Sequence, residues 1–258
     1  MGKTNLDPAQ FSLAWSGDGG RAGNLHEILV RRLGHMIVSG AFGAGEALPP
    51  AEELCERFQV TRSVLREGLK ILSGKGMIEA RQKTGTRVRP RADWNHLDPD
   101  ILLWRFTSPK LDDVVALFEL RRAIEPEAAA LCARRATPEQ IAMLGQIMTR
   151  MEEVAGDNMA FALPDLQFHL AIMRFTGNDL IVSLSGMIEV ALLISFRLSD
   201  EITGDQRHAL PLHRTLLDAI SIRDEAGART ATLVLLDGAE NDVRRVVARS
   251  GFAAGFPR

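Results

Sequence analysis

The sequence predicts a mainly α-helical protein, with a small N-terminal domain that contains two short strands and a larger C-terminal domain built only of helices. Three observations lead to this prediction. Apolar residues recur at three- and four-residue steps over most of the chain between residues 25 and 249. Residues 77–88 instead show the pattern of two short strands around a turn. The charge also differs between the two parts, because residues 25–91 carry a net charge of +5 and residues 92–258 a net charge of −7.

The composition is that of a globular protein and excludes several other classes. The chain has 258 residues, of which 46% are hydrophobic and 25% charged. No apolar run approaches the roughly 20 residues needed to cross a bilayer, and the N-terminus lacks the order of a signal peptide. We therefore expect a cytoplasmic protein with no membrane partner. Two cysteines are too few for a disulfide framework or a four-thiolate zinc site.

The N-terminal part has the element order of a winged helix-turn-helix domain, which we expect to span residues 25–91. Glycine and small polar residues predict a flexible arm before it, over residues 1–24. Thr61 is a good N-cap for the third helix of the domain. The expected elements are three helices and two strands, at residues 25–39, 52–58, 61–73, 77–80 and 86–88.

The second helix of a helix-turn-helix motif presents its N-terminal residues to the major groove of DNA. Here those residues include Arg62 and Arg66, one helical turn apart, which could bind phosphates or guanine edges. Thr61 and Ser63 could donate to phosphate oxygens. Residues 61–91 hold nine basic and two acidic residues, which favours DNA binding, although a solvated charged face is the alternative.

Four segments of this domain form a recognisable pattern, namely Ala47–Leu54, Val60–Glu67, Gly76–Glu79 and Gly85–Val88. They resemble the DNA-binding domain of the GntR family of bacterial regulators. The resemblance implies a homodimer on a short palindromic operator, with Arg62 and Arg66 as principal contacts, Thr61 and Ser63 as auxiliary contacts, and Gly85 in the wing. Many relatives carry a basic residue where this chain has Glu52, so the operator preference of those relatives cannot be transferred.

The remainder of the chain predicts a helical bundle. A linker with a short helix is expected at residues 92–109, the bundle itself at residues 110–250, and a tail at residues 251–258. Capping or helix-breaking residues separate the helical stretches, and such a bundle can enclose a cavity between its helices. The expected helices are Leu111–Arg135, Pro138–Ala155, Asn158–Thr176, Asp179–Leu198, Gln206–Ile222 and Glu225–Arg249.

Three residues of the bundle are candidate metal ligands. Asp165 and His169 lie four residues apart and therefore project from one face of a helix, where they could share an ion. His213 follows 44 residues later, on a partly apolar face. A histidine bonded to the backbone is the alternative for each ring. A metal-dependent hydrolase is an alternative function, although no H-E-x-x-H motif supplies a general base.

The bundle is similar to the FCD domain, the ligand-binding domain of the FadR branch of the same family, whose opening helix resembles Glu119–Pro126. The resemblance implies a divalent metal, Zn²⁺ or a similar ion, beneath a small carboxylic acid. Asp165, His169 and His213 match the first three of four ligand positions, and Leu235 stands at the fourth, where relatives carry histidine. Arg121 and Arg197 are candidates for binding the acid and Asn241 for binding its hydroxyl groups, although each could be structural.

Residues 93–104 are similar to a segment of the galactonate-operon group of this family, which implies a sugar acid as effector. Trp94, Leu97, Ile101 and Trp104 could also simply dock the linker helix on the bundle. The sequence therefore predicts a repressor of a sugar-acid catabolic operon, released from its operator by an aldonate-type acid. The alternative is a FadR-branch regulator that responds to another small carboxylate, such as lactate or a dicarboxylate.

Overall fold

The computed structural model describes residues 25–81, 85–107, 109–199 and 206–249. It divides the chain into two compact units, Met1–Thr107 and Ser108–Arg258. The predicted arm (1–24), the predicted tail (251–258) and the tip of the wing, Lys83 and Thr84, lie outside the described residues.

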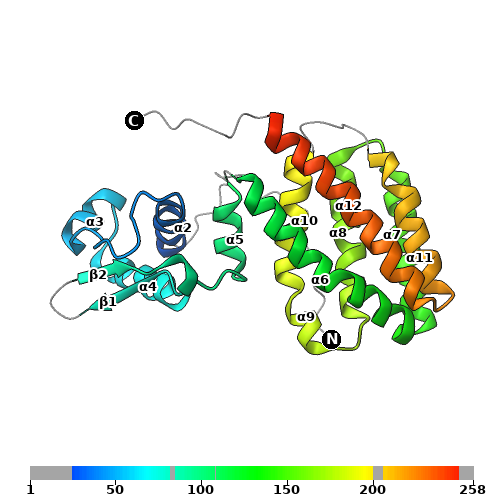
Figure 1. Cartoon of the computed structure of the whole chain (residues 1–258). Helices are drawn as coiled ribbons and strands as arrows, with labels where there is room; N and C mark the ends of the chain where they lie inside the picture. The colour runs from blue at the N-terminus through cyan, green and yellow to red at the C-terminus, as the bar shows by residue number, and fades with distance from the viewer. Residues whose placement is uncertain (1–24, 82–84, 108, 200–205, 250–258) are drawn as a thin grey trace. The chain divides into compact units, whose positions relative to one another are not determined.

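The first unit is a winged helix-turn-helix domain, as predicted (Figure 1). Thr61 caps α4, because its side-chain oxygen accepts a hydrogen bond from the Val64 backbone N–H at 3.4 Å. Strands β1 and β2 pair antiparallel, with Ile78 opposite Val88, and the backbone of residues 46–48 bonds to the outer side of β2. The elements are α2 (Leu25–Val38), α3 (Ala51–Phe58), α4 (Arg62–Gly74), β1 (Ile78–Arg81) and β2 (Gly85–Val88).

One apolar core joins these elements. Leu29 and Leu33 of α2 pack with Leu65 and Leu72 of α4, and all four side chains are buried. On the opposite side of α4, Thr61, Arg62, Ser63 and Arg66 are exposed. The 3.6-residue period of α4 therefore separates its packing face from the polar face predicted to meet DNA.

The segment after the wing belongs to this first unit, which corrects the expectation that it docks on the bundle. It forms η1 (Arg91–Asp93) and α5 (Pro99–Arg105), and α5 packs on α2. Ile101 and Trp104 lie in the same buried core as α2 and α4, and Trp94 packs against that core, whereas Leu97 is exposed. Apolar side chains in a linker indicate that the linker packs against a domain, but they do not indicate which of the two domains it packs against.

An ion-pair cluster also fastens α5 to the end of α4. The Lys75 ammonium donates to both carboxylate oxygens of Asp98, at 2.7 and 2.8 Å, and lies 2.7 Å from Asp100 Oδ2. Burial lowers the pKa of Lys75, but its hydrogen bonds to Asp100 and Asp98 outweigh this effect and raise the pKa overall. Asp98 also caps α5 by accepting from the backbone N–H groups of Asp100 and Ile101.

Replacing Gly34 with alanine is expected to destabilise the first unit by about 1–3 kcal/mol, because the site has no room for a methyl group. A Cβ atom at Gly34 would lie 2.3 Å from Cζ3 of the Trp104 ring. Thermal unfolding measures the effect. Gly74→Ala is the matched control, since a Cβ there meets nothing within 4 Å. Equal midpoints for the two variants would contradict the packing of Trp104 on Gly34.

The second unit is an all-α bundle, as predicted. Two of the expected helices differ in form, and the predicted ends of others are displaced by one or two residues. The stretch 179–198 is divided at Leu184, where the hydroxyls of Ser183 and Ser185 donate to the Asp179 and Val182 carbonyls. The stretch 206–222 begins as a 3₁₀ turn. The elements are α6 (Leu111–Arg135), α7 (Pro138–Glu153), α8 (Asn158–Arg174), α9 (Asp179–Ser183), α10 (Ser185–Ser199), η2 (Gln206–His208), α11 (Leu210–Ser221) and α12 (Glu225–Arg249).

Helices α6 and α12 run side by side over much of their length (Figure 1). Arg122 of α6 links them by ion pairs to Asp237, at 2.6 Å, and to Glu240, at 2.5 Å.

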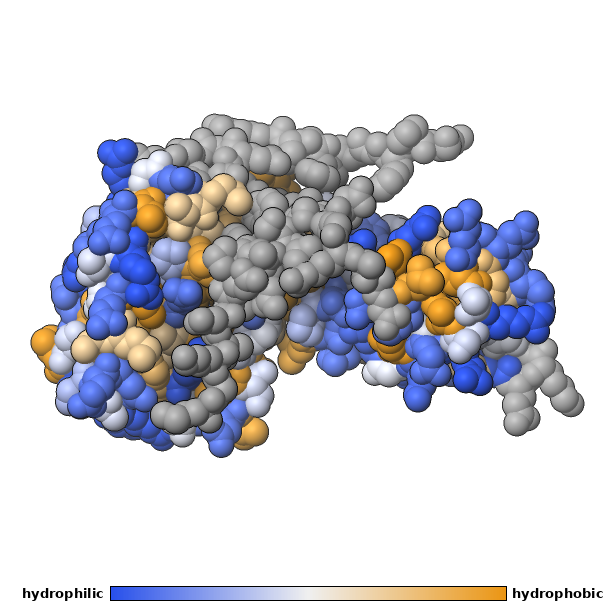
Figure 2. All heavy atoms as spheres, turned by 180° about the vertical axis from the view of Figure 1, so that it is seen from behind, coloured by the Kyte–Doolittle hydropathy of each residue, from blue (hydrophilic) through white to orange (hydrophobic). Residues whose placement is uncertain are grey.

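On the face seen in Figure 2, hydrophilic side chains predominate and apolar ones form small groups. Within the described ranges, every helix is too short or too polar to cross a membrane.

Candidate functional site

The bundle holds a cavity lined by both polar and apolar side chains, as is usual for small-molecule sites. Side chains from α6, α8, α10, α11 and α12 contribute to its wall. Its polar lining consists of Arg121, Asp165, His169, Ser195, His208, His213 and Asp242, and its apolar lining includes Phe161, Leu192, Phe196, Leu212 and Leu235.

The three residues predicted as metal ligands meet at this cavity. One ligand atom each from Asp165, His169 and His213 lies within 4.8 Å of the other two, and all three residues are buried. His213 Nε2 is 2.7 Å from Asp165 Oδ1, and His169 Nε2 is 3.9 Å from the same oxygen. The i, i+4 spacing on α8 brings the first pair together, and α11 supplies the third residue.

The hydrogen bonding of His213 fits a cation at this place. Its Nδ1 lies 2.9 Å from the Ala209 carbonyl oxygen, which can only accept, so Nδ1 carries the proton. In the neutral ring, Nε2 then directs a lone pair at the Asp165 carboxylate, and it has no hydrogen-bond partner among the described residues. Two acceptors that face each other at 2.7 Å in a buried site repel, and a shared cation removes that repulsion.

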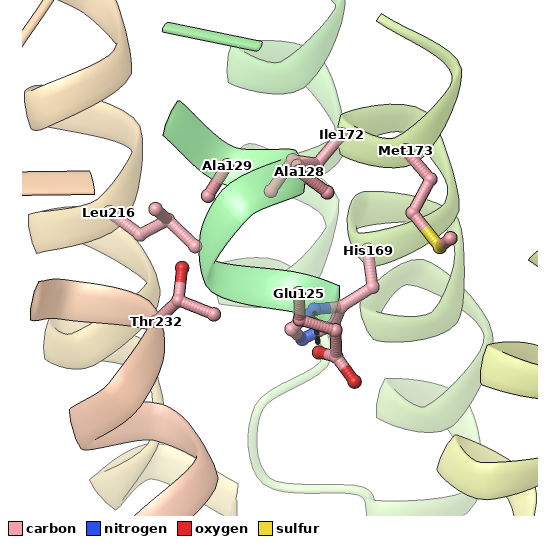
Figure 3. A pocket seen from close by; sticks show the side chains of 8 residues that line it. All are labelled: Glu125, Ala128, Ala129, His169, Ile172, Met173, Leu216 and Thr232. Atoms are coloured by element: carbon pink, nitrogen blue, oxygen red, sulfur yellow. Dashed lines mark ion pairs between the residues drawn. The ribbon is translucent and has the colours of Figure 1, made fainter. Parts of the chain in front are cut away.

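Glu125, which sequence reasoning missed, lies behind His169. Its Oε2 is 3.5 Å from His169 Nδ1, and Figure 3 shows the two side chains facing each other between α6 and α8. A carboxylate in this position orients a ligating histidine so that its other nitrogen faces the ion. The sequence feature that could have indicated a role for Glu125 is its spacing from Arg121, which lies four residues earlier on the same helix and can therefore form an ion pair with it.

The charge states of the cluster suit metal ligation. Burial lowers the pKa of His169 by more than Asp165 and Glu125 raise it, which favours the neutral ring. Burial opposes ionisation of Asp165, but His213 and His169 in their protonated forms, together with Arg121, hold its pKa below the usual value. A neutral imidazole and an ionised carboxylate are the forms that bind a divalent metal.

Arg121, a predicted effector contact, lines the cavity and is only 2% exposed. Its Nε donates to Glu125 Oε1 at 2.6 Å, and its Nη1 donates to Ser195 Oγ at 3.1 Å. The ion pair with Glu125 explains how a guanidinium group can be buried here. Glu125 thus contacts both a predicted effector residue and a predicted metal ligand.

The prediction for Asn241 is corrected by its position. Asn241 is exposed and is not part of the cavity wall, whereas Leu235, Gly238, Ala239 and Asp242 of the same helix line it. Two helical turns take about seven residues, so Asp242 returns to the face of Leu235 and Asn241 does not. The side chain of the other predicted contact, Arg197, lies outside the described residues.

Leu235 lines the cavity, as expected for the position at which relatives carry a fourth histidine. The protein therefore offers an Asp and two His to an ion here and an apolar side chain in place of a fourth ligand. Three protein ligands leave a coordination position for water or for an oxygen of a bound acid. The donor set of one carboxylate and two imidazoles fits Zn²⁺ or a similar ion.

The residues predicted to meet DNA lie at the N-terminal end of α4 and in the wing. Arg66 has 80% of its side chain exposed, and Arg62 has 75% exposed. Thr61 and Ser63 are exposed beside them. Gly85 is exposed at the start of β2 with φ of +81°, a conformation that favours glycine.

Comparisons with known proteins agree with both units. Residues 25–88 match the family of bacterial regulatory proteins named gntR, and residues 116–238 match the FCD domain. The galactonate operon transcriptional repressor of Escherichia coli K12 is 31% identical over 229 residues, which cover 86% of this chain and 98% of the repressor. An uncharacterised regulator of the same organism, YieP, is 32% identical over 83% of this chain and 93% of its own length.

A solved structure shares the fold. It is described as Lar, which controls the agr system of Listeria monocytogenes, and it has a TM-score of 0.62 at 17% identity, covering 88% of this chain and 99% of that one. These relatives are transcriptional regulators, so the alternative of a metal-dependent hydrolase is wrong. The chain belongs to the GntR family of bacterial regulatory proteins, as a transcriptional regulator that carries an FCD domain.

Proposed function

We propose that this regulator is a cytoplasmic homodimeric repressor of a sugar-acid catabolic operon and that an aldonate-type acid releases it from its operator. The observation that carries the proposal is the cavity lined by Arg121 and by the Asp165, His169 and His213 cluster. It occurs in a chain 31% identical to a galactonate operon repressor over nearly all of that relative's length.

The charges around the cavity support an acid that binds together with a divalent cation. Asp165 and Asp242 line the cavity and Glu125 lies behind it, so the anionic groups outnumber the guanidinium group of Arg121. An acid alone would be repelled by this surface. A divalent ion held by Asp165, His169 and His213 would supply positive charge and a coordination position for a carboxylate oxygen. Arg121 would hold the same carboxylate through its remaining N–H groups.

The lining also suits a polyhydroxy acid better than a short one. Ser195 and Asp242 offer oxygen atoms that can accept hydrogen bonds from hydroxyl groups, and they come from different helices, α10 and α12.

On the DNA side, Thr61, Arg62, Ser63, Arg66 and Gly85 would form the operator contacts of each protomer. Two protomers related by a two-fold axis would place two such surfaces on the half-sites of a palindrome. An effector that binds more tightly to the DNA-free conformation lowers operator affinity by the coupling free energy, typically about 1–3 kcal/mol.

A gel shift combined with a thermal-shift panel tests the proposal. Duplex DNA from upstream of the protein's own gene should bind at moderate salt, and a duplex of shuffled sequence should not. Galactonate, gluconate and uronates are compared with lactate, succinate and citrate, each with and without chelator. A ligand present at about 100 times its Kd adds roughly 2.7 kcal/mol of stability.

We expect one sugar acid to raise the unfolding midpoint, to lose this effect with chelator and to release the DNA. If only the small carboxylates act, the effector class is wrong while the regulator stands. Specific DNA binding that no acid in the panel weakens would contradict the proposal as a whole.

A further inference from the structure

An ion pair joins the N-terminal ends of the two helices of the helix-turn-helix motif. The Glu52 carboxylate, in the first turn of α3, accepts a hydrogen bond from Nη2 of Arg62, the first residue of α4. Both side chains are exposed, at 69% and 75%, although they lie within a domain of net positive charge. The pair therefore stands on the surface that carries the DNA-contacting residues.

The N-terminus of a helix ordinarily attracts a phosphate through its free N–H groups and its dipole. In α3 this place is taken by Glu52 and Glu53. A carboxylate there interacts favourably with the helix dipole and repels a DNA phosphate, at any base sequence. The start of α3 is thus a poor phosphate contact, in a motif whose other helix presents two exposed arginines.

Glu52 also changes what Arg62 can do. A guanidinium group that already bonds one carboxylate has part of its charge neutralised, and its remaining N–H groups point away from that partner. Arg66 differs, because its nearest carboxylate is Glu67 on the same helix, 3.8 Å from its Nε. The two arginines are therefore not equivalent, and only Arg62 is bonded to the neighbouring helix.

We propose that Glu52 is a specificity-determining residue of the DNA-binding surface. It restrains Arg62 so that its free N–H edge serves a base rather than a phosphate, and it lowers the affinity of the domain for DNA of any sequence. This inference rests on the DNA-binding role of the domain and is independent of the effector and the metal.

Glu52→Gln tests the proposal, with Glu53→Gln as the matched control. Both residues are exposed acids in the first turn of α3, so both variants lose the same charge near the same helix end. Among the described residues, Glu53 makes no ion pair with an arginine, whereas Glu52 does. Affinities for the upstream duplex and for a shuffled duplex are measured by fluorescence anisotropy between 50 and 200 mM salt.

We expect Glu52→Gln to bind the shuffled duplex about fivefold more tightly, which is the effect of one unit charge near a phosphate in water. The slope of log K against log salt should steepen by about 0.9 for each domain bound. The ratio of specific to non-specific affinity should fall, and Glu53→Gln should show a smaller change in all three quantities. In an Arg62→Ala background the effect of Glu52→Gln on the ratio of specific to non-specific affinity should vanish, while the tighter binding of the shuffled duplex should remain.

Equal effects of the two glutamine variants would overturn the proposal, because the cause would then be net charge alone. An unchanged affinity of Glu52→Gln for the shuffled duplex would overturn it as well. Loss of preference at one cytosine without a change in salt slope would also contradict it, because Glu52 would then read that base directly. The shuffled duplex gives a result even if the upstream duplex does not contain the operator.

Discussion

Arg66→Ala is expected to remove measurable operator binding while the domain stays folded. The Arg66 side chain is 80% exposed on α4, and its nearest carboxylate lies 3.8 Å away, so truncation leaves no cavity and no buried charge. Loss of an arginine that binds a guanine edge costs about 1–3 kcal/mol at each half-site, and a dimer loses this twice. A gel shift measures the binding, and the thermal unfolding midpoint measures the fold.

Lys70→Ala is the matched control for this variant. Lys70 is exposed on the same helix, one turn further from the end that is predicted to face DNA. Its loss should weaken binding mildly and equally for all sequences, as expected for a phosphate contact. If Arg66→Ala and Lys70→Ala weaken operator binding to the same extent, Arg66 does not read the operator sequence.

His213→Ala is expected to abolish metal binding and effector response and to leave operator binding intact. The variant removes one of three ligands, and it also removes the close approach of Nε2 to Asp165 at 2.7 Å. Metal content is measured after dialysis against Zn²⁺, and effector response by release of operator DNA. His208→Ala is the control, because His208 lines the same cavity but is outside the metal cluster.

A buried alanine could also loosen the bundle, so His213→Gln provides a second test. Glutamine fills more of the space and offers a weaker ligand, and it should keep the fold while metal affinity falls. Undiminished induction by the effector in a folded His213→Gln variant with no bound metal would contradict the role of the cluster. Similar metal loss in His208→Ala would show that the cluster is not the site.

Local signals in the sequence predict most of the elements and the centre of the site. Thr61 as a helix cap, the i, i+4 pair on α8 and the exposed face of α4 each depend on residues within one or two helical turns. Spacing along the chain does not bring His213 to Asp165, because that meeting depends on how α11 packs. Resemblance to the family supplies the connection, and the structure agrees with it.

The corrections concern long-range packing and helical phase. Asn241 lies six residues after Leu235, where the helix has not completed two turns, and Asp242 lines the cavity instead. Glu125 escapes sequence reasoning because its partners are Arg121, on its own helix, and His169, 44 residues away on another. Its four-residue spacing from Arg121 is a local signal, but the same spacing is typical of an ordinary ion pair on a helix surface.

The packing of α5 on α2 determines which fragment of this regulator can be exchanged with a relative. A fragment that ends at residue 91, shortly after the wing, lacks Ile101 and Trp104 and therefore leaves Gly34 without the ring that packs on it. It also lacks Asp98 and Asp100, so the Lys75 ammonium loses both partners. A chimaera that joins this DNA-binding domain to the ligand-binding domain of a relative should therefore be joined after Thr107, so that α5 is retained with the DNA-binding domain.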